Sequence, residues 1–152
     1  MRYGLLALPL IGVMILAAGC LDVDEVLNPD LELSVTGVMV TNLSAGSPRE
    51  VADNISEYVY VKVNVTNMND DMDHIFISDK FNAEDSSRNP FQADSLANLE
   101  ERENTFTLKP DEYREFYVVF LVPRDVKLTL LVMDMGADED FTDAIPDYDH
   151  LS

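Results

Sequence analysis

The sequence predicts an all-β fold, an antiparallel β-sandwich, and three observations support this prediction. Apolar and polar residues alternate along several segments between residues 31 and 134, and a period of two is typical of strands with one buried face. Polar turn residues separate these segments, and no long segment has a helical period. Residues 31–134 also have the length of a single sandwich domain, about 100 residues.

The first predicted strands differ in how regularly apolar and polar residues alternate along them. In EYVYVKVNVTN, residues 57–67, four valines share one face and mainly tyrosine or polar side chains share the other. In LELSVTGVMVT, residues 31–41, the pattern changes phase at Gly37, which indicates a β-bulge. HIFIS at 74–78 is predicted as a short strand. The side chains expected to face inward are those of Leu31, Leu33, Val35, Val59, Val61, Val63 and Val65.

Two further strands are predicted near the end of the domain, YREFYVVFLVP at 113–123 and DVKLTLLVMD at 125–134. Pro123 and Asp125 mark a tight corner between them, because both residues favour turns. The side chains expected to face inward here are those of Phe116, Val118, Phe120, Val122, Val126, Leu128, Leu130 and Val132.

Between the first and the last predicted strands, apolar and polar residues alternate least clearly along residues 80–107. Within this stretch, DSLANLEEREN at 94–104 is expected to form one or two helical turns with Leu96 and Leu99 facing inward.

The first 20 residues have the form of an export signal. Arg2 supplies a positive region, an apolar run follows, and small residues precede Cys20. This segment resembles a lipoprotein signal, the lipobox, in which the cysteine after the cleavage site is lipidated; Ala17 stands where leucine is more common. The resemblance implies a signal peptide over 1–19 and a lipid anchor at Cys20. The alternative is an uncleaved single-pass anchor, and either arrangement places the remaining chain outside the cytoplasmic membrane.

The charge of the chain excludes some partners. With 29 acidic and 10 basic residues and a formal net charge of −19, the surface repels the phosphate backbone of nucleic acids. It also repels anionic headgroups, so attachment to a membrane needs another source of free energy, which lipid chains on Cys20 would supply. Residues 20–30 are expected to be a spacer behind the lipid. Residues 135–152 are expected to form a mobile acidic tail, whose Phe141, Ile145 and Tyr148 allow it to dock on a partner or on the sandwich.

A second resemblance covers residues 31–134. The turn TLKPDE at 107–112, followed by FYVVFLVP and a final apolar strand, resembles the Ig-like domains of unknown function that follow lipoprotein signals in many prokaryotic surface proteins. Leu108, Pro110 and Glu112 match the motif, and Asp111 stands at the usual glycine, where aspartate tolerates a left-handed conformation. The resemblance implies an Ig-like sandwich of seven or eight strands and brings no settled activity.

The sequence offers little support for an enzyme. Motifs for a serine nucleophile, a phosphate loop or a zinc helix are missing from it, and His74 and His150 are its two histidines. His74 follows an acidic stretch and is expected to be a solvated residue at a loop end. In the same stretch Asn67, Asn69, Asp71 and Asp73 place oxygen donors at alternate positions, which suits Ca²⁺. A solvated acidic loop is the alternative, and no other cofactor is expected.

Two further sets of residues are candidates for modification or binding. Asn42, Asn54 and Asn64 begin glycosylation sequons, and Asn64 falls on the outward face of its predicted strand. Tyr58 and Tyr60 share the outward face of one strand, and Tyr113 and Tyr117 that of another. If these strands are neighbours, the tyrosines form a stripe suited to a protein or glycan partner. Cross-strand packing, or cover by residues 80–107, is the alternative.

These observations predict a non-catalytic interaction or accessory module, held at the extracytoplasmic face of the cell membrane by a lipid on Cys20. A protein or glycan at the cell surface is the expected partner, and nucleic acid is excluded. The alternative is a surface lipoprotein that binds a small ligand or Ca²⁺ through the acidic loop at 67–73.

Overall fold

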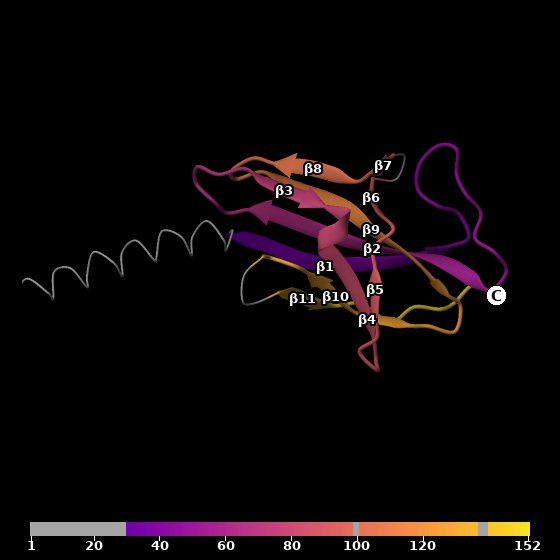
Figure 1. The fold of residues 1–152 in the computed structure, drawn as a ribbon. Coiled ribbons are helices and arrows are strands. Elements are labelled where there is room, and N and C mark those ends of the chain that lie inside the picture. The colour runs from indigo at the N-terminus through magenta and orange to yellow at the C-terminus, as the bar shows by residue number, and fades with distance from the viewer. Residues whose placement is uncertain (1–29, 99–100, 137–139) are drawn as a thin grey trace, which may run out of the picture.

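The protein is a β-sandwich in a computed structural model that describes residues 30–98, 101–136 and 140–152. Within these residues eleven strands form three antiparallel sheets (Figure 1). The strands are β1 (Leu31–Thr41), β2 (Ser56–Asn67), β3 (His74–Ile77), β4 (Phe81–Asp85), β5 (Pro90–Gln92), β6 (Ser95–Ala97), β7 (Arg102–Glu103), β8 (Thr105–Leu108), β9 (Tyr113–Pro123), β10 (Leu128–Met133) and β11 (Phe141–Ala144). The prediction of an all-β sandwich is confirmed.

The sheets contain five, four and two strands. The largest has the order β1-β2-β9-β6-β7, the second has the order β11-β10-β4-β5, and β3 pairs with β8. A single 3-10 turn, Ser78–Lys80, separates β3 from β4. The strands exceed the seven or eight expected because the stretch between residues 80 and 107, which alternates poorly, contributes several short strands.

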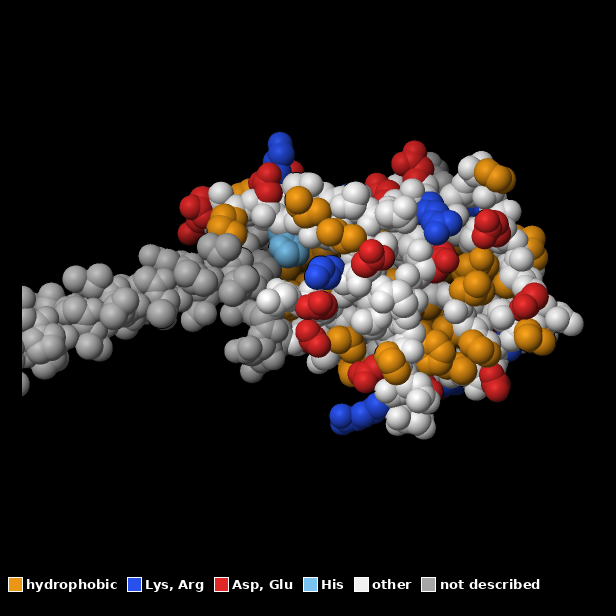
Figure 2. Space-filling model, viewed as in Figure 1, with side chains coloured by type: hydrophobic (Ala, Val, Ile, Leu, Met, Phe, Trp, Pro, Cys, Tyr) orange, Lys and Arg blue, Asp and Glu red, His pale blue; other side chains and the backbone are white. Residues whose placement is uncertain are grey.

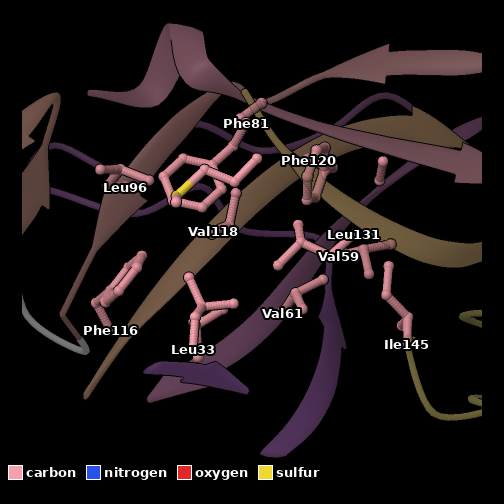
Figure 3. Close-up of a cluster of buried hydrophobic side chains, with 14 of the residues drawn as sticks. Leu33, Val59, Val61, Phe81, Leu96, Phe116, Val118, Phe120, Leu131 and Ile145 are labelled. Carbon is pink, nitrogen blue, oxygen red and sulfur yellow. The ribbon is translucent and has the colours of Figure 1, made fainter. Parts of the chain in front are cut away.

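The core lies between the sheets and is built mainly from β2 and β9. The four valines of β2 and the alternate residues Phe116, Val118, Phe120 and Val122 of β9 are buried as predicted. Figure 3 shows several of these side chains, among them Val59, Val61 and Val118, meeting residues from β1 and β10, together with Ile145 from the C-terminal segment. Because burying a side chain of this size stabilises a fold by roughly 1.5–3 kcal/mol, the two long central strands provide much of the free energy of folding.

Two predictions of strand phase had opposite outcomes. The register of β1 against β2 shifts between Val35 and Gly37, so the predicted bulge is confirmed. In β10 a second shift, between Leu128 and Leu130, was not predicted. It turns Leu131 and Met133 into the core and leaves Leu130 and Val132 half-buried, because a shift of one residue exchanges the two faces of a strand. The predicted inward positions of Leu130 and Val132 are therefore wrong.

The helical turns expected at 94–104 are also replaced by strands. β6 pairs with β9, placing Leu96 opposite Val118, and β7 pairs with β6. Leu96 is buried as expected, but it is buried as part of a strand. Pairing with β9 satisfies the hydrogen-bonding groups on the second edge of that strand, which a helix in this position would leave unpaired. Leu99 lies outside the described residues.

The C-terminal residues belong to the sandwich, which corrects the expectation of a mobile tail. β11 pairs with β10 through Leu131 and Asp143, among others. The segment that follows, residues 145–152, is named the C-terminal strap; it buries Ile145 and Tyr148 against the core. The apolar residues of the predicted tail thus pack on the domain itself. The domain therefore extends beyond residue 134.

The predicted signal peptide, Cys20 and most of the spacer lie outside the described residues. In the part of the chain that the structure describes, no helix has the length and apolar character needed to cross a membrane.

Candidate functional site

The acidic loop predicted to bind Ca²⁺ is organised around the amide of Asn67. Asn67 is buried, and its Nδ2 donates hydrogen bonds to the carbonyl oxygens of Met72, at 2.8 Å, and Leu108, at 3.0 Å. Its Oδ1 accepts from the backbone N and the Nδ2 of Asn69, at 3.0 and 2.8 Å. This oxygen already has two donors, so Asn67 has a structural role in the loop.

The same asparagine connects this loop to the turn before β9. The backbone N of Asp111 donates to the carbonyl oxygen of Asn67 at 2.8 Å, and Asn67 N donates to the carbonyl oxygen of Glu112 at 3.0 Å. Asp111 has a φ of 61°, so it adopts the left-handed conformation that the sequence motif requires. Glu112 completes the turn by accepting a hydrogen bond from Lys109 N at 2.8 Å.

The other candidate ligands of this loop are dispersed. Asp71 and Asp73 are exposed, and Asn69 is half-buried beside Asn67. Among the described residues, no three His, Cys, Asp or Glu side chains gather closely enough to hold a metal ion. Ca²⁺ binding therefore stays a prediction that the geometry does not favour.

The three sequon asparagines lie in different places. Asn42 and Asn54 are exposed at either end of the loop between β1 and β2. Asn64 is half-buried on the outer face of β2, with an Oδ1 that is buried and has no hydrogen-bond partner. Glycosylation stays a prediction for all three.

The tyrosines do not form one exposed stripe. Tyr58 and Tyr60 are 3% and 6% exposed, Tyr117 is half-buried, and Tyr113 is 58% exposed. Tyr60 and Tyr117 meet edge to face with ring centroids 5.8 Å apart, and the Tyr60 hydroxyl donates to the Leu43 carbonyl at 3.0 Å. Tyr58 and Tyr60 also pack with residues of the loop between β1 and β2, Ala45 and Ala52, and with Ala97 and Val119 of the sheet.

This second, smaller core explains the electrostatics of the two tyrosines. Burial raises the pKa of Tyr58 and of Tyr60 above the ordinary value of 10.0, because the ionised phenolate loses its hydration. The two residues are thus packing residues in this second core. The cross-strand packing that the sequence offered as an alternative is confirmed by the contact between Tyr60 and Tyr117. The cover comes from Ala45 and Ala52 of the loop between β1 and β2, together with Ala97 from the 80–107 stretch.

A cleft that the sequence did not indicate lies between β3 and the end of β10. It is named the β3 cleft, has a volume of about 180 Å³, and is lined by His74–Ile77, Lys80, Phe81 and Met133–Gly136. Phe76 and Phe81 form its buried apolar side, and Ile75 and Ile77 are 58% and 38% exposed. A pocket for a drug-sized ligand is larger, roughly 300–1,000 Å³, so the β3 cleft suits a few side chains of a larger partner.

The β3 cleft exists because the pairing between β10 and β4 stops at its entrance. The last paired residues are Met133 and Phe81, after which Asp134 N donates to the Lys80 carbonyl at 2.8 Å. The Nζ of Lys80 and Oδ2 of Asp134 are also 3.6 Å apart. Within the described residues, β3 continues without a strand on this side and pairs only with β8. One edge of β3 is therefore open.

His74 lies in the cleft rather than in solvent. Its ring meets the ring of Phe76 edge to face at 4.6 Å, and burial lowers the pKa of His74 below its ordinary value of 6.5. The imidazole is therefore largely neutral at pH 7. Within the described residues it has no hydroxyl partner that would make it the general base of a nucleophile, and the expectation of a fully solvated histidine is corrected to a half-buried one.

The C-terminal strap closes the other end of the sandwich around a buried carboxylate. Glu57 of β2 is fully buried; its Oε1 accepts a hydrogen bond from His150 Nδ1, and its Oε2 accepts one from Leu151 N at 2.9 Å. Tyr148 accepts a bond from Leu128 N at 2.8 Å. Sequence reasoning missed this site because Glu57 and His150 are 93 residues apart.

The face drawn in Figure 2 carries apolar, acidic and basic side chains next to one another. Acidic residues also lie near the β3 cleft: Asp73 directly precedes β3, Asp79 lies in the turn that follows it, and both are exposed. Because Lys80 is paired with Asp134, the surroundings of the cleft keep a negative charge.

A comparison with family models decides the relationship of the chain. The model described as a domain of unknown function, DUF4352, matches residues 23–142, which is most of the chain. The chain belongs to the DUF4352 family. The matched residues of this DUF4352 domain include β1 through the start of β11, so both the residues that line the β3 cleft and the buried Glu57 lie within the match.

Two solved structures are similar to this DUF4352 protein. An uncharacterized β-sandwich protein from Clostridium difficile has a TM-score of 0.49 and 9% identity, covering 76% of this chain and 85% of the other. The secreted protein MPT63 from Mycobacterium tuberculosis has a TM-score of 0.46 and 14% identity, covering 68% and 76%. No curated protein matches the sequence.

Proposed function

We propose that this DUF4352 protein is a non-catalytic binding module, anchored by a lipid on Cys20 at the extracytoplasmic face of the cell membrane, and that the β3 cleft is its binding surface. The observation that carries the proposal is that β3, among the described residues, has one unpaired edge and exposes Ile75 and Ile77 beside an apolar cleft. An exposed strand edge with apolar side chains is a surface that proteins normally cover or charge, because it pairs readily with another chain.

Two other parts of the domain are covered by the chain itself. The tyrosine face is covered by residues 42–53, and the strap covers the end that contains Glu57. The side chains that would serve an enzyme are engaged elsewhere: His150 bonds to Glu57, and His74 packs against Phe76. A role in binding therefore agrees better with these contacts than a role in catalysis.

The proposal is tested by chemical crosslinking in native membranes at native salt, followed by purification through this protein. We expect a partner protein in stoichiometric amount. Recovery of the protein alone, with a crosslinker that links known neighbours in the same membrane, would contradict a role as an accessory subunit.

The anchor requires a separate test, the intact mass of the membrane-bound protein. A lipidated form that begins at Cys20 supports the proposal, and a Cys20→Ala variant should then lose the lipid and the cleavage. A wild-type mass that includes residues 1–19 without lipid would establish the uncleaved anchor instead.

A further inference from the structure

We propose that the β3 cleft binds an extended segment of a partner protein, apolar at alternate positions and flanked by basic residues, which adds a strand to the open edge of β3. This inference rests on the proposed function and specifies the kind of partner. Three features of the cleft lead to it: the pairing of β3, the arrangement of its side chains, and the charge around it.

The pairing of β3 requires an extended segment. β3 pairs with β8 through all four of its residues, from His74 opposite Leu108 to Ile77 opposite Thr105. In an antiparallel pair, alternate residues direct their N–H and C=O groups away from the partner strand. Those groups of β3 point to the side where β10 has ended, and an added strand would bond to them.

The length of β3 sets the length of the segment. β10 pairs with β4 as far as Met133, and the cleft lies between β3 and the residues Met133–Gly136. A strand that pairs along the four residues of β3 would therefore be about four or five residues long. A helix does not supply backbone groups for such pairing, because its own are used internally.

The side chains of β3 determine which residues the segment carries. Phe76 points into the core, whereas Ile75 and Ile77 lie on the opposite face and are exposed. Side chains of an added strand would lie beside those of β3 on the same face. Apolar residues at alternate positions would therefore cover Ile75 and Ile77.

The charge around the cleft selects basic flanks and disfavours a second copy of this chain. Asp73 and Asp79 lie at the two ends of β3, where the flanks of a bound segment would emerge. Lysine or arginine in those flanks would meet these carboxylates. Two copies would instead bring together two surfaces of the same negative sign, from chains that each carry a formal −19, and like-charge contact opposes association.

The test uses the full chain, expressed in its native cells with the photo-reactive residue benzoylphenylalanine in place of Ile75. After irradiation in intact membranes, mass spectrometry identifies the segment joined to position 75. The matched control carries the same group in place of Val51, which is 67% exposed and lies on the loop between β1 and β2. Crosslinking from this position reports on apolar exposure without an open strand edge.

We expect one segment of another protein, apolar at alternate positions and followed or preceded by Lys or Arg, in about tenfold greater yield from position 75 than from position 51. Adding Ile77→Glu should lower the yield from position 75 about tenfold. A second copy, a segment of the same chain, lipid, or a helical or acidic segment at position 75 would overturn the inference.

Two pairs of variants test the role of charge in binding at the cleft. Replacing both Asp73→Asn and Asp79→Asn should lower the crosslinking yield about fivefold at low salt and less at high salt. The control pair, Asp53→Asn and Asp125→Asn, removes equal charge from exposed residues away from β3 and should leave the yield unchanged. An equal loss of crosslinking yield with both pairs of variants would contradict recognition of basic flanks at the cleft.

These results separate this inference from the proposed function. If chemical crosslinking recovers a partner but position 75 does not contact it, the domain is a binding module that uses another surface, and the strand-addition mechanism is wrong. If neither experiment recovers a partner, the proposed function itself fails.

Discussion

The two ends of the sandwich differ in whether another described segment of the chain covers them. Figure 1 places the C-terminus at one end and β3 with β8 toward the other. At the first end, the strap covers the core and provides two hydrogen-bond donors to the buried carboxylate of Glu57. No described segment covers β3 in this way, and one edge of that strand stays unpaired. Among the described residues, the chain itself covers the end that contains Glu57 and leaves one edge of β3 unpaired, so the edge of β3 is the better candidate for a partner.

The largest expected effect comes from removing the closed end. Ending the chain after Ala144 removes Ile145 and Tyr148 from the core and leaves the Glu57 carboxylate buried without donors. We expect the free energy of unfolding, measured in urea, to fall by about 3–5 kcal/mol. Removing only Ser152, which is exposed, is the control and should have little effect.

A second change to the truncated chain isolates the contribution of the carboxylate. Glu57→Gln replaces a buried charge by a neutral amide, so it should restore about 1–3 kcal/mol of the loss. If the truncated chain is as stable as the full chain, the strap is not part of the folded domain.

The next largest effect distinguishes the buried tyrosines from the exposed one. Tyr58→Ser removes a side chain that is 3% exposed, and we expect a loss of about 3 kcal/mol in unfolding experiments. Tyr113→Ser, at a position that is 58% exposed, should change stability by no more than about 0.5 kcal/mol. Similar losses at both positions would contradict the second core beneath residues 42–53.

An intermediate effect concerns pH and His74. Because burial holds the pKa of His74 below 6.5, the unfolded chain binds this proton more readily than the folded one. The contribution of His74 to stability is therefore complete above pH 6.5 and falls as the pH drops from there toward the lower pKa of the folded state. Unfolding curves of wild type and His74→Gln should differ in slope against pH only across this window. Parallel slopes would place His74 in solvent.

A smaller effect is expected at the open end. Ile75→Glu and Val51→Glu both replace exposed apolar residues, so each should change the free energy of unfolding by no more than about 0.5 kcal/mol. Only Ile75→Glu should weaken recovery of the partner by crosslinking. A large loss of stability with Ile75→Glu would mean that β3 is covered in the free protein.

The smallest effect is expected for Ca²⁺. Since the Oδ1 of Asn67 already accepts two hydrogen bonds, millimolar Ca²⁺ at fixed ionic strength should not raise the melting temperature. Mg²⁺ at the same ionic strength is the control. A rise with Ca²⁺ alone would revive the calcium site at residues 67–73.

The sequence predicted correctly those features that a pattern within a single strand or turn determines. The valines of β2 alternate with tyrosine and polar residues, so their inward face was readable, and the left-handed turn at Asp111 followed from a local motif. In β10 both faces are largely apolar, which hid the register shift after Leu128. The partners of Glu57 and the end of the ladder beside β3 depend on contacts between distant segments, which no local pattern records.

The most direct measurement of the contrast between the two ends is hydrogen exchange of individual backbone amides in the full chain. The Leu151 amide, which donates to buried Glu57, and the Leu128 amide, which donates to Tyr148, should be protected. Alternate amides of β3 should exchange rapidly, because one edge of that strand is unpaired. Rapid exchange at Leu151 together with protection throughout His74–Ile77 would contradict the account.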